Sequence, residues 1–404
     1  MPRKHEEAGC GVEEAKAAES PRRRRRVSRS DPSPPVVAAF VGLDRPPRGL
    51  GMSPKEESDM WHSGMDVHSR LTAFHILDGA GQRLAAGTIP TTEASLGEFC
   101  RALAKATHFY LEASTGSAWV ARVIDANGHR VTVVDPNRIR AISGSPKKTD
   151  ASDAATLATL GRAGLLTAVH VRSAETDRFR RVLTARHALV RARANLMRAT
   201  RSLLRSEGHL LPRCDGDDFA ARLRGTWEIP EGHAETVEPL AEAIDQLTGQ
   251  VLELEKHVAE VAKANAPVVR LLRGIPGVGE LVATSFMALV EDPARFRSSS
   301  EVAAYLGLTP WVNESAGKRR EGGITKRGNR ATRALLVQAA WSHMRCGMDT
   351  ALKRWFHKLE KRLGSKKAIT AVARKIGELM WTMWRKGVGY EPFPPSARRS
   401  PAPT

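Results

Sequence analysis

The sequence predicts an α/β domain, then a long helical segment, then a mainly helical C-terminal domain with a helix-hairpin-helix-like motif. Three observations support this order: apolar runs alternate with helical stretches early in the chain, heptads fill the middle, and helical spacing dominates the end. We expect the α/β domain at residues 61–172, a coiled-coil linker at 173–265 and the last domain at 266–391. Residues 1–60 and 392–404, rich in Pro, Ser and charge, are expected to be disordered.

The α/β domain is predicted from short apolar runs that are separated by turn residues and helical spacing. We expect strands at residues 65–77, 84–89, 109–113 and 130–134, and helices at residues 96–106, 117–126 and 153–166. Strands that alternate with helices indicate a central sheet with a helical layer.

The middle segment carries a coiled-coil pattern. Apolar residues follow an unbroken three-four spacing over residues 237–261, and an earlier stretch, residues 182–204, repeats apolar pairs every seven residues. β-branched residues at every a position, with Leu or Val at d, favour two-stranded packing. Two arrangements stay open: the two helices pair within one chain, or one of them pairs with a second protomer.

The charge of the chain indicates a polyanionic partner. The formal net charge is +19; residues 1–60 hold 12 Lys/Arg and 10 Asp/Glu, a net of +2, so +17 belongs to residues 61–404. The basic character therefore lies in the folded part of the chain rather than in the arginine run at residues 22–26.

The spacing of the cysteines and the hydropathy of the chain indicate the cellular compartment in which the protein is expected. The four cysteines are widely scattered, which excludes paired Cys-x-x-Cys zinc sites and gives no disulfide framework. No secretory signal or membrane-spanning apolar run is visible. We expect a cytoplasmic, nucleoid-associated bacterial protein with no membrane partner.

Four carboxylates form the first candidate site: Asp66, Glu112, Asp150 and Asp153. The first two close strand-like runs, and the last two stand three apart on one face of a predicted helix. Any one of them alone would be read as a solvated acid or a helix cap. Together they can hold two Mg²⁺ ions, or Mn²⁺, roughly 4 Å apart for chemistry on a phosphodiester.

A second group lies at residues 313–333, where basic residues alternate with glycine. This composition suits a flexible loop that follows a phosphate backbone. The candidate backbone-binding residues are Lys318, Arg319, Arg320, Lys326, Arg327 and Arg330. Ser315 is the hydroxyl among them, although its chemistry alone favours a loop serine or a helix cap.

Glycines upstream of this region suggest a further phosphate contact. Gly274, Gly277 and Gly279 separate two apolar helical segments, as in the hairpin of a helix-hairpin-helix module. There, glycine lets backbone N–H groups approach a phosphate at a helix N-terminus. A purely structural turn remains an open alternative.

Several motifs in order resemble one known family. Gly-Met-Asp-Val-His at 64–68, Leu-Glu-Ala at 111–113, Val-Val-Asp-Pro-Asn at 133–137 and Lys-Thr-Asp-x-x-Asp-Ala at 148–154 resemble the N-terminal domain of the insertion-sequence 110 family of DEDD transposases. Residues 272–279, 305–310, 315–318, 323–330 and 367–390 are similar to its C-terminal half.

The resemblance implies a RuvC-like, RNase-H-type domain in which Asp66, Glu112, Asp150 and Asp153 bind Mg²⁺. It implies that Ser315 is a nucleophile that links covalently to DNA, within a homodimer or homotetramer. It also implies a structured bridge RNA that guides the enzyme by pairing with donor and target DNA. Glu314-Ser315-Ala316-Gly317 departs from the two serines and two glycines that family members often have, so Ser315 alone remains as the candidate.

We therefore expect a transposase of an insertion sequence that cuts and rejoins DNA. The alternatives are a site-specific DNA invertase of the same fold, a metal-only nuclease or junction resolvase that uses activated water, and a non-enzymatic regulator that binds RNA or DNA. A tyrosine recombinase is disfavoured, because Tyr110, Tyr305 and Tyr390 are the only tyrosines and none lies in a basic cluster.

Overall fold

A computed structural model describes residues 60–136, 150–225, 227, 232–315 and 318–393, without the side chains of 312–321. The predicted disorder at the two ends falls almost entirely outside these residues. Contacts divide the chain into two units, Met1–Val171 and Arg172–Thr404, and each is described by itself. Within the described residues, no helix is both long and apolar enough to cross a bilayer.

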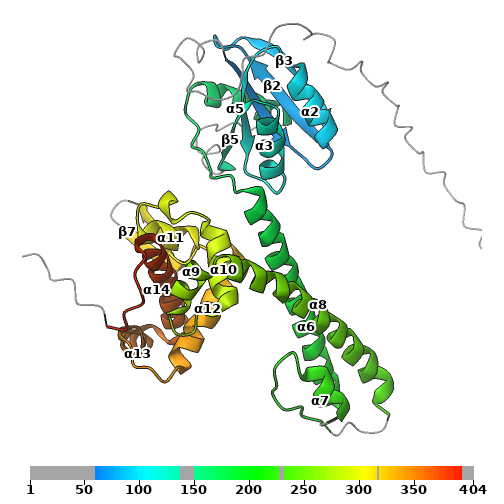
Figure 1. Cartoon of the computed structure of the whole chain (residues 1–404), viewed down its shortest axis with the longest axis vertical. Coiled ribbons are helices and arrows are strands. Elements are labelled where there is room, and N and C mark those ends of the chain that lie inside the picture. Colours follow the sequence, from blue (N-terminus) through cyan, green and yellow to red (C-terminus); the bar gives the residue numbers. More distant parts are fainter. Residues whose placement is uncertain (1–59, 137–149, 226, 228–231, 316–317, 394–404) are drawn as a thin grey trace, which may run out of the picture. The chain divides into compact units, whose positions relative to one another are not determined.

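The first unit is built on a five-stranded mixed sheet (Figure 1). Its strands are β1 (Trp61–Val67), β2 (Leu71–Leu77), β3 (Arg83–Pro90), β4 (Thr107–Glu112) and β5 (Arg130–Val134), in the order β3-β2-β1-β4-β5. β1, β2 and β3 pair antiparallel, whereas β4 lies parallel to β1 and β5 parallel to β4. The expected central sheet is thus present.

The single strand expected at residues 65–77 was wrong, because this stretch forms the β1–β2 hairpin. Val67 pairs with Thr72, and the amide of His68 donates to the carbonyl of Leu71 at 3.2 Å. The three polar residues between Val67 and Leu71 form the turn. Antiparallel pairing of the two halves satisfies backbone groups that one long strand would leave to other partners.

Helices cover both faces of the sheet. α2 (Glu93–Ala102) and α3 (Ser117–Ala126) pack on one face, against a core that includes Met65, Phe74 and Phe109. α5 (Asp150–Arg162) lies on the other face, where Leu157 joins Tyr110 and Val134. α3 and β5 have the predicted bounds; α2 and α5 begin and end earlier than the helices expected at 96–106 and 153–166.

Two glycines bring the backbone of α5 directly onto the sheet. A Cβ atom at Gly64 of β1 would lie 2.0 Å from the Ala154 carbonyl oxygen and 2.5 Å from the Ala158 nitrogen. A Cβ atom at Gly161 of α5 would lie 2.4 Å from the Tyr110 ring of β4. Since real Cβ atoms do not approach so closely, only glycine fits both positions. The start of α5 is thereby fixed beside β1.

A chain of hydrogen bonds runs across the strands on this same face. The hydroxyl of Tyr110 is hydrogen-bonded to Nδ1 of His62 and Nδ1 of His108, both at 3.0 Å, and Nε2 of His108 to Thr132 Oγ1 at 2.8 Å. Burial lowers the pKa of His108 to about 4 and raises the pKa of Tyr110 to about 12. Both groups are therefore neutral near pH 7, and the α5 face keeps its polar atoms satisfied.

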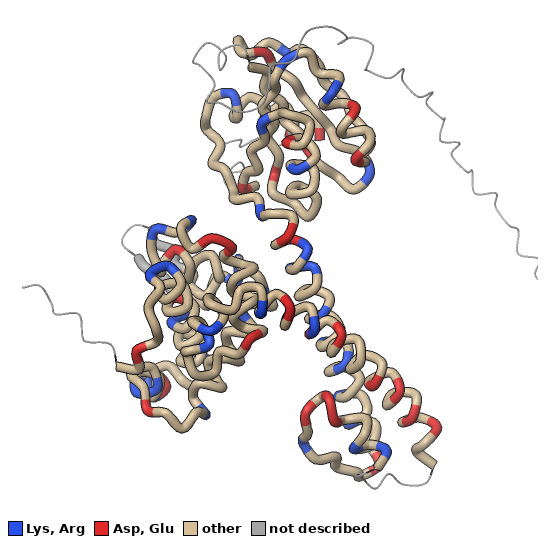
Figure 2. Tube along the Cα trace, viewed as in Figure 1, with Lys and Arg blue, Asp and Glu red and all other residues tan. Residues whose placement is uncertain are grey.

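The second unit begins with an antiparallel pair of long helices, α6 (Ala174–Ser206) and α8 (Ala234–Ala264), with α7 (Phe219–Gly225) packed near one end. Arg186 of α6 donates to Glu255 of α8 at 2.9 Å. α6 carries nine arginines against two acidic residues, and α8 seven acidic residues against two lysines (Figure 2). Of the two arrangements left open by the heptads, the structure shows the pairing within one chain.

The rest of this unit is mainly helical, as expected. It contains α9 (Ala266–Arg273), α10 (Glu280–Val290), a 3₁₀ turn (Pro293–Arg295), α11 (Ser299–Tyr305), the strands β6 (Pro310–Ser315) and β7 (Lys318–Ile324), α12 (Arg330–Arg345), α13 (Ala351–Leu363) and α14 (Ser365–Lys386). Ile369, Val372, Ile376 and Met380 of α14 contribute to the apolar core of this part.

The flexible loop expected at residues 313–333 was wrong. β6 and β7 pair antiparallel, with Ser315 opposite Lys318, and α12 begins at Arg330. Antiparallel pairing satisfies the backbone groups of a sequence too polar to bury many side chains.

The Gly64→Ala substitution tests the close contact between β1 and α5. Overlap with the backbone of Ala154 and Ala158 forces α5 away from the sheet, so we expect the free energy of unfolding to fall by about 3 kcal/mol or more. Chemical denaturation of the full chain measures this loss. Gly116→Ala is the control, because its Cβ would meet only Val67 Cγ1 at an ordinary 3.8 Å; equal losses for both variants would contradict the account.

Candidate functional site

Two of the predicted acids lie side by side at the ends of neighbouring parallel strands. Met65 of β1 is paired with Leu111 of β4, so the next residues along, Asp66 and Glu112, occupy adjacent positions. Side chains alternate along a strand, which puts both carboxylates on the face opposite Met65 and Leu111. This is the face that carries Gly64 and α5.

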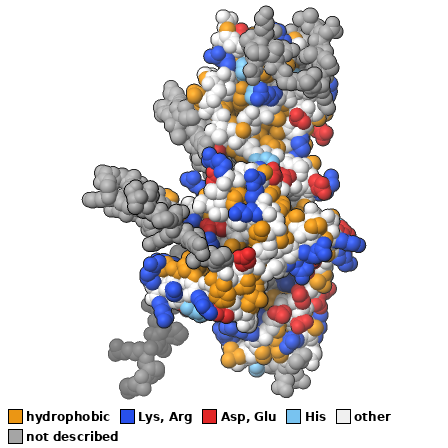
Figure 3. Space-filling view, turned by 60° about the vertical axis from the view of Figure 1, so that its left-hand side comes forward, with side chains coloured by type: hydrophobic (Ala, Val, Ile, Leu, Met, Phe, Trp, Pro, Cys, Tyr) orange, Lys and Arg blue, Asp and Glu red, His pale blue; other side chains and the backbone are white. Residues whose placement is uncertain are grey.

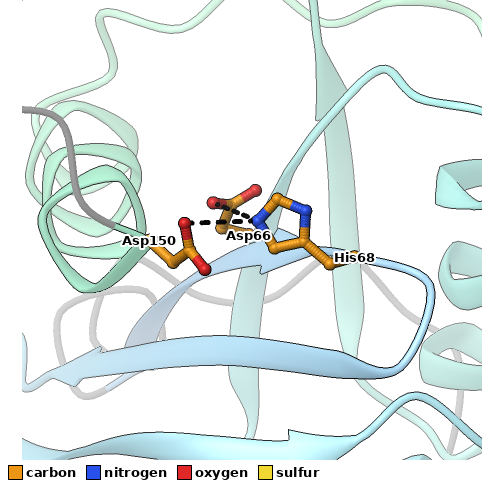
Figure 4. A group of neighbouring side chains, drawn as sticks. All are labelled: Asp66, His68 and Asp150. Atoms are coloured by element: carbon orange, nitrogen blue, oxygen red, sulfur yellow. Dashed lines mark hydrogen bonds and ion pairs between the residues drawn. The ribbon is translucent and has the colours of Figure 1, made fainter. Parts of the chain in front are cut away.

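The other two acids come from the first turn of α5. Nε2 of His68 lies 3.2 Å from Asp66 Oδ2 and 3.4 Å from Asp150 Oδ1, so the imidazole bridges a strand acid and a helix acid (Figure 4). One ligand atom from each of these three residues lies within 4.8 Å of the other two. Asp153 follows on the same turn of α5, close enough to Asp66 to influence its pKa.

The electrostatics of Asp66 are unfavourable for a bare carboxylate. Burial is the largest cause that raises its pKa above the usual value, and the negative charges of Asp150 and Asp153 raise it further, whereas His68 lowers it. Because the folded-state pKa exceeds the unfolded one, ionisation of Asp66 destabilises the fold, and this loss develops as pH rises through the folded-state pKa. A cation at this position removes the penalty.

The residues present fit a divalent cation. Two carboxylates offer the oxygen ligands that Mg²⁺ prefers, and the imidazole nitrogen adds a donor that Mn²⁺ accepts. Sequence reasoning missed His68 as a member of this group. Its only signal was its place in Gly-Met-Asp-Val-His, two residues after Asp66.

Ser315 belongs to the second unit, where it is the last residue of β6. β7 begins with Lys318, Arg319 and Arg320. Lys318 is paired with Ser315, and Arg319 is paired with Glu314. The backbone register therefore places Ser315 at the end of β6, paired with the first residue of a strand that begins with three basic residues. The side chains of these residues lie outside the described part of the structure.

The remaining cations, Lys326, Arg327 and Arg330, are exposed on a segment whose backbone is held in place. The amide of Lys326 donates to the carbonyl of Gly307 at 3.1 Å, and a Cβ at Gly328 would lie 2.2 Å from the Tyr305 carbonyl oxygen. The space-filling view shows Lys and Arg side chains in several separate groups on the face that it presents (Figure 3). These three cations are thus presented from a fixed scaffold.

Of the glycines expected to meet phosphate, Gly277 has a clear packing role in the structure. Gly277 has φ +90°, and a Cβ there would lie 2.5 Å from the Ala339 carbonyl oxygen of α12. Nδ1 of His343 is hydrogen-bonded to the Pro276 carbonyl at 2.8 Å, which holds the same turn. Gly274 ends α9 and Gly279 precedes α10. A phosphate contact at this turn stays a prediction.

Two family models match the chain. Residues 269–356 match the model described as "Transposase IS116/IS110/IS902 family", and residues 63–207 match the DEDD transposase model of the insertion-sequence 110 group, described as "Transposase". Together they cover both the acidic group and the segment that carries Ser315. The chain belongs to the insertion-sequence 110 family of transposases.

Curated relatives agree with this assignment. A probable family 20 transposase of Pseudomonas aeruginosa is 28% identical over 289 residues, which cover 70% of this chain and 85% of the relative. The transposase for insertion sequence element IS1111A of Coxiella burnetii is 28% identical over 286 residues, covering 68% and 76%. That for IS1328 of Yersinia enterocolitica is 27% identical over 285 residues, covering 69% and 83%. Transposases are enzymes, and the match to the DEDD model spans the mixed-sheet unit with its acids and continues through α6.

Asp66→Asn should separate stability from cation binding in this transposase. In EDTA we expect the variant to unfold at the same or a higher temperature than the wild type, because the substitution removes a partly buried negative charge that lies near two other acids. With Mn²⁺ at about 100 times its Kd, the wild type should gain about 2.7 kcal/mol, and the variant little of it. Thermal unfolding with and without Mn²⁺ measures both effects.

Asp125→Asn, on the exposed side of α3, is the matched control for charge and should keep the full response to Mn²⁺. An undiminished Mn²⁺ response in Asp66→Asn would show that the cation binds elsewhere.

Proposed function

We propose that this transposase cleaves and rejoins DNA at the ends of an insertion sequence and at its target, with a cation-holding acidic group and Ser315 as the nucleophile. The observation that carries the proposal is the bridging of Asp66 and Asp150 by His68 beneath α5, in a chain of a DEDD transposase family. The mixed sheet with acids at the ends of its central strands supports a RuvC-like, RNase-H-type assignment for the first unit.

The four acids come from two kinds of position. Asp66 and Glu112 offer oxygens from rigid strand ends, and Asp150 and Asp153 offer them from the first turn of α5. When bound, Mg²⁺ or Mn²⁺ would supply Lewis-acid stabilisation of the charge that develops on the phosphate. Nε2 of His68 lies within reach of both Asp66 and Asp150, so the ring can hold the two side chains close to one point.

Ser315 is proposed to act by in-line attack on phosphorus. Its Oγ–P bond forms as the bond between phosphorus and one sugar oxygen breaks. The serine proton passes to a base or to solvent, and the leaving sugar oxygen takes up a proton to become a free hydroxyl. The seryl phosphodiester keeps the energy of the broken bond, so a second sugar hydroxyl can displace serine and rejoin the strand. The cations of β7 and of the segment before α12 would hold the backbone and stabilise charge at phosphorus.

The proposed partners are DNA, a structured guide RNA and further copies of the chain in a dimer or tetramer, in the cytoplasm. The net charge of +17 outside residues 1–60 supports a polyanionic partner. The arginine excess of α6 over its partner helix supports a nucleic-acid surface on this helix.

Ser315→Ala tests the nucleophile. We expect complete loss of strand exchange and of any covalent protein–DNA adduct, because Ser315 is the only serine, threonine or tyrosine of the sequence between residues 311 and 324. Denaturing gels of reactions on end-labelled DNA resolve the adduct, and Ser300→Ala, an exposed serine of α11, is the control. Cleavage that survives in Ser315→Ala would favour the metal-only nuclease.

The same assay distinguishes the transposase from a regulator and from an invertase. Asp150→Asn should abolish cleavage for the transposase and for the metal-only nuclease, whereas a non-enzymatic regulator would keep its binding activity unchanged. A site-specific invertase would give the same chemistry and the same covalent adduct, but it would act on inverted sites within one molecule.

Guidance by RNA predicts a discrete RNA in the purified protein. Sequencing of RNA that co-purifies with the full chain should return one structured species rather than a mixture of cellular fragments. Random fragments, in amounts that fall as salt is raised, would show attraction by charge alone and would contradict guidance.

A further inference from the structure

The second unit contains a small hollow between α6, α10 and the start of α12. It is lined by Arg180, Thr184 and His187 of α6, Ser285 of α10 and Ala331 of α12, among others. The cavity volume is ≈ 40 Å³, which holds a few water molecules or one phosphoryl group but no nucleobase. None of these residues was singled out by the sequence.

The charge around this hollow is positive. None of its lining residues is acidic, and Arg186 at its edge is paired with Glu255. In the described part of the chain Arg180 makes no ion pair. Burial, then the nearby Arg172, lowers its pKa, and the more weakly acting Tyr305, Asp177 and Glu291 raise it only in part. Burial also lowers the pKa of His187, followed by the positive charges of Arg191, Arg330 and Arg186. A partly buried, unpaired guanidinium is costly unless an anion completes it.

Two uncharged donors converge on the same space. Ser285 is 3% exposed, and its Oγ has no hydrogen-bond partner among the described atoms. The first turn of α12, a helix of 16 residues, borders the hollow. Asn329 Oδ1 accepts from the amide and the hydroxyl of Thr332, so this cap leaves the Arg330 and Ala331 amides without a partner inside the helix. Unpaired N–H groups and the positive end of the helix dipole favour an anion.

We propose that this hollow, formed by Arg180, His187, Ser285 and the N-terminus of α12, binds one phosphate group of a nucleic-acid strand. The ligand is an anion because the Arg180 guanidinium, the Ser285 hydroxyl and the amides of the helix end can all donate to it, and no lining residue is acidic. It is a phosphate of a strand because the exposed cations Arg327 and Arg330 adjoin the same helix end and would hold the neighbouring phosphates. The inference deepens the proposed function and rests on it.

Arg180→Gln tests the site in the full chain. Binding to a duplex DNA oligonucleotide, followed by fluorescence anisotropy over a range of salt, should weaken about tenfold, as for the loss of one charged hydrogen bond. The slope of log Kobs against log salt should become shallower by about 0.9, the value for one phosphate contact. Arg181→Gln, which removes an exposed charge from the next position of α6, is the matched control and should change both quantities less.

Ser285→Ala is the second variant. It should weaken DNA binding several-fold without reducing the free energy of unfolding, because the hydroxyl has no partner in the protein. Thermal unfolding of each variant checks that it folds. Unfolding of the wild type and Arg180→Gln with inorganic phosphate shows whether free phosphate occupies the hollow instead.

Each outcome decides between the proposals. If the wild type binds DNA but Arg180→Gln and Arg181→Gln have the same DNA affinity and the same salt slope, the hollow does not bind a phosphate of the DNA. Inorganic phosphate could stabilise the wild type but not Arg180→Gln, while both proteins bind DNA equally well. The ligand would then be free phosphate, which would overturn the proposal that the hollow binds a phosphate of a nucleic-acid strand. A wild type that binds DNA in an Arg180-dependent way but exchanges no strands contradicts the proposed function alone.

Discussion

The backbone of α5 lies directly against β1 because position 64 has no side chain, and the acidic group depends on this contact. Asp66 is two residues beyond Gly64 on the same face, and Asp150 and Asp153 occupy the turn of α5 just before Ala154, whose carbonyl faces Gly64. The packing that joins helix and strand therefore also brings like charges together. Burial and the neighbouring acids then raise the pKa of Asp66, a cost that makes sense for a site that holds a cation.

In the second unit, too, glycines allow close backbone contacts, here near the segment that carries Lys326 and Arg327. Gly307 has φ +69°, and a Cβ there would lie 2.7 Å from the nitrogen of Gly328; Gly277 is pressed against α12 in the same way. Gly277 and Gly328 belong to stretches that also suggested phosphate binding. Close backbone packing accounts for these glycines without a ligand, and it fixes the backbone of the segment that carries Lys326 and Arg327.

The sequence predicted the elements whose signal is local. The helix and strand at residues 117–126 and 130–134 were found with correct bounds because apolar spacing and turn residues mark both ends. The sequence marked Asp66 and Glu112 as acids beside apolar, strand-like runs, but only the parallel register of β1 and β4 in the structure places them side by side. The hairpin at residues 61–77 was missed because a three-residue polar turn is a weak signal inside a long apolar run.

Other features depend on contacts between distant segments and have no local signal. His68 joins the acids only because the β1–β2 turn bends its ring toward α5. Arg180, Ser285 and Ala331 are more than a hundred residues apart from first to last, and only the packing of three helices makes them neighbours. The heptads predicted helix pairing but not its partner, because one apolar seam suits either a second chain or a returning helix.

The most direct test of the central claim is the anomalous scattering of Mn²⁺ in crystals of the wild-type protein. We predict a peak between the end of β1 and the first turn of α5, with carboxylate oxygens of Asp66 and Asp150 as ligands and Glu112 and Asp153 completing the site or a second ion beside it. A map with Mn²⁺ bound only at other surfaces, and these acids separate and solvated, would contradict the account.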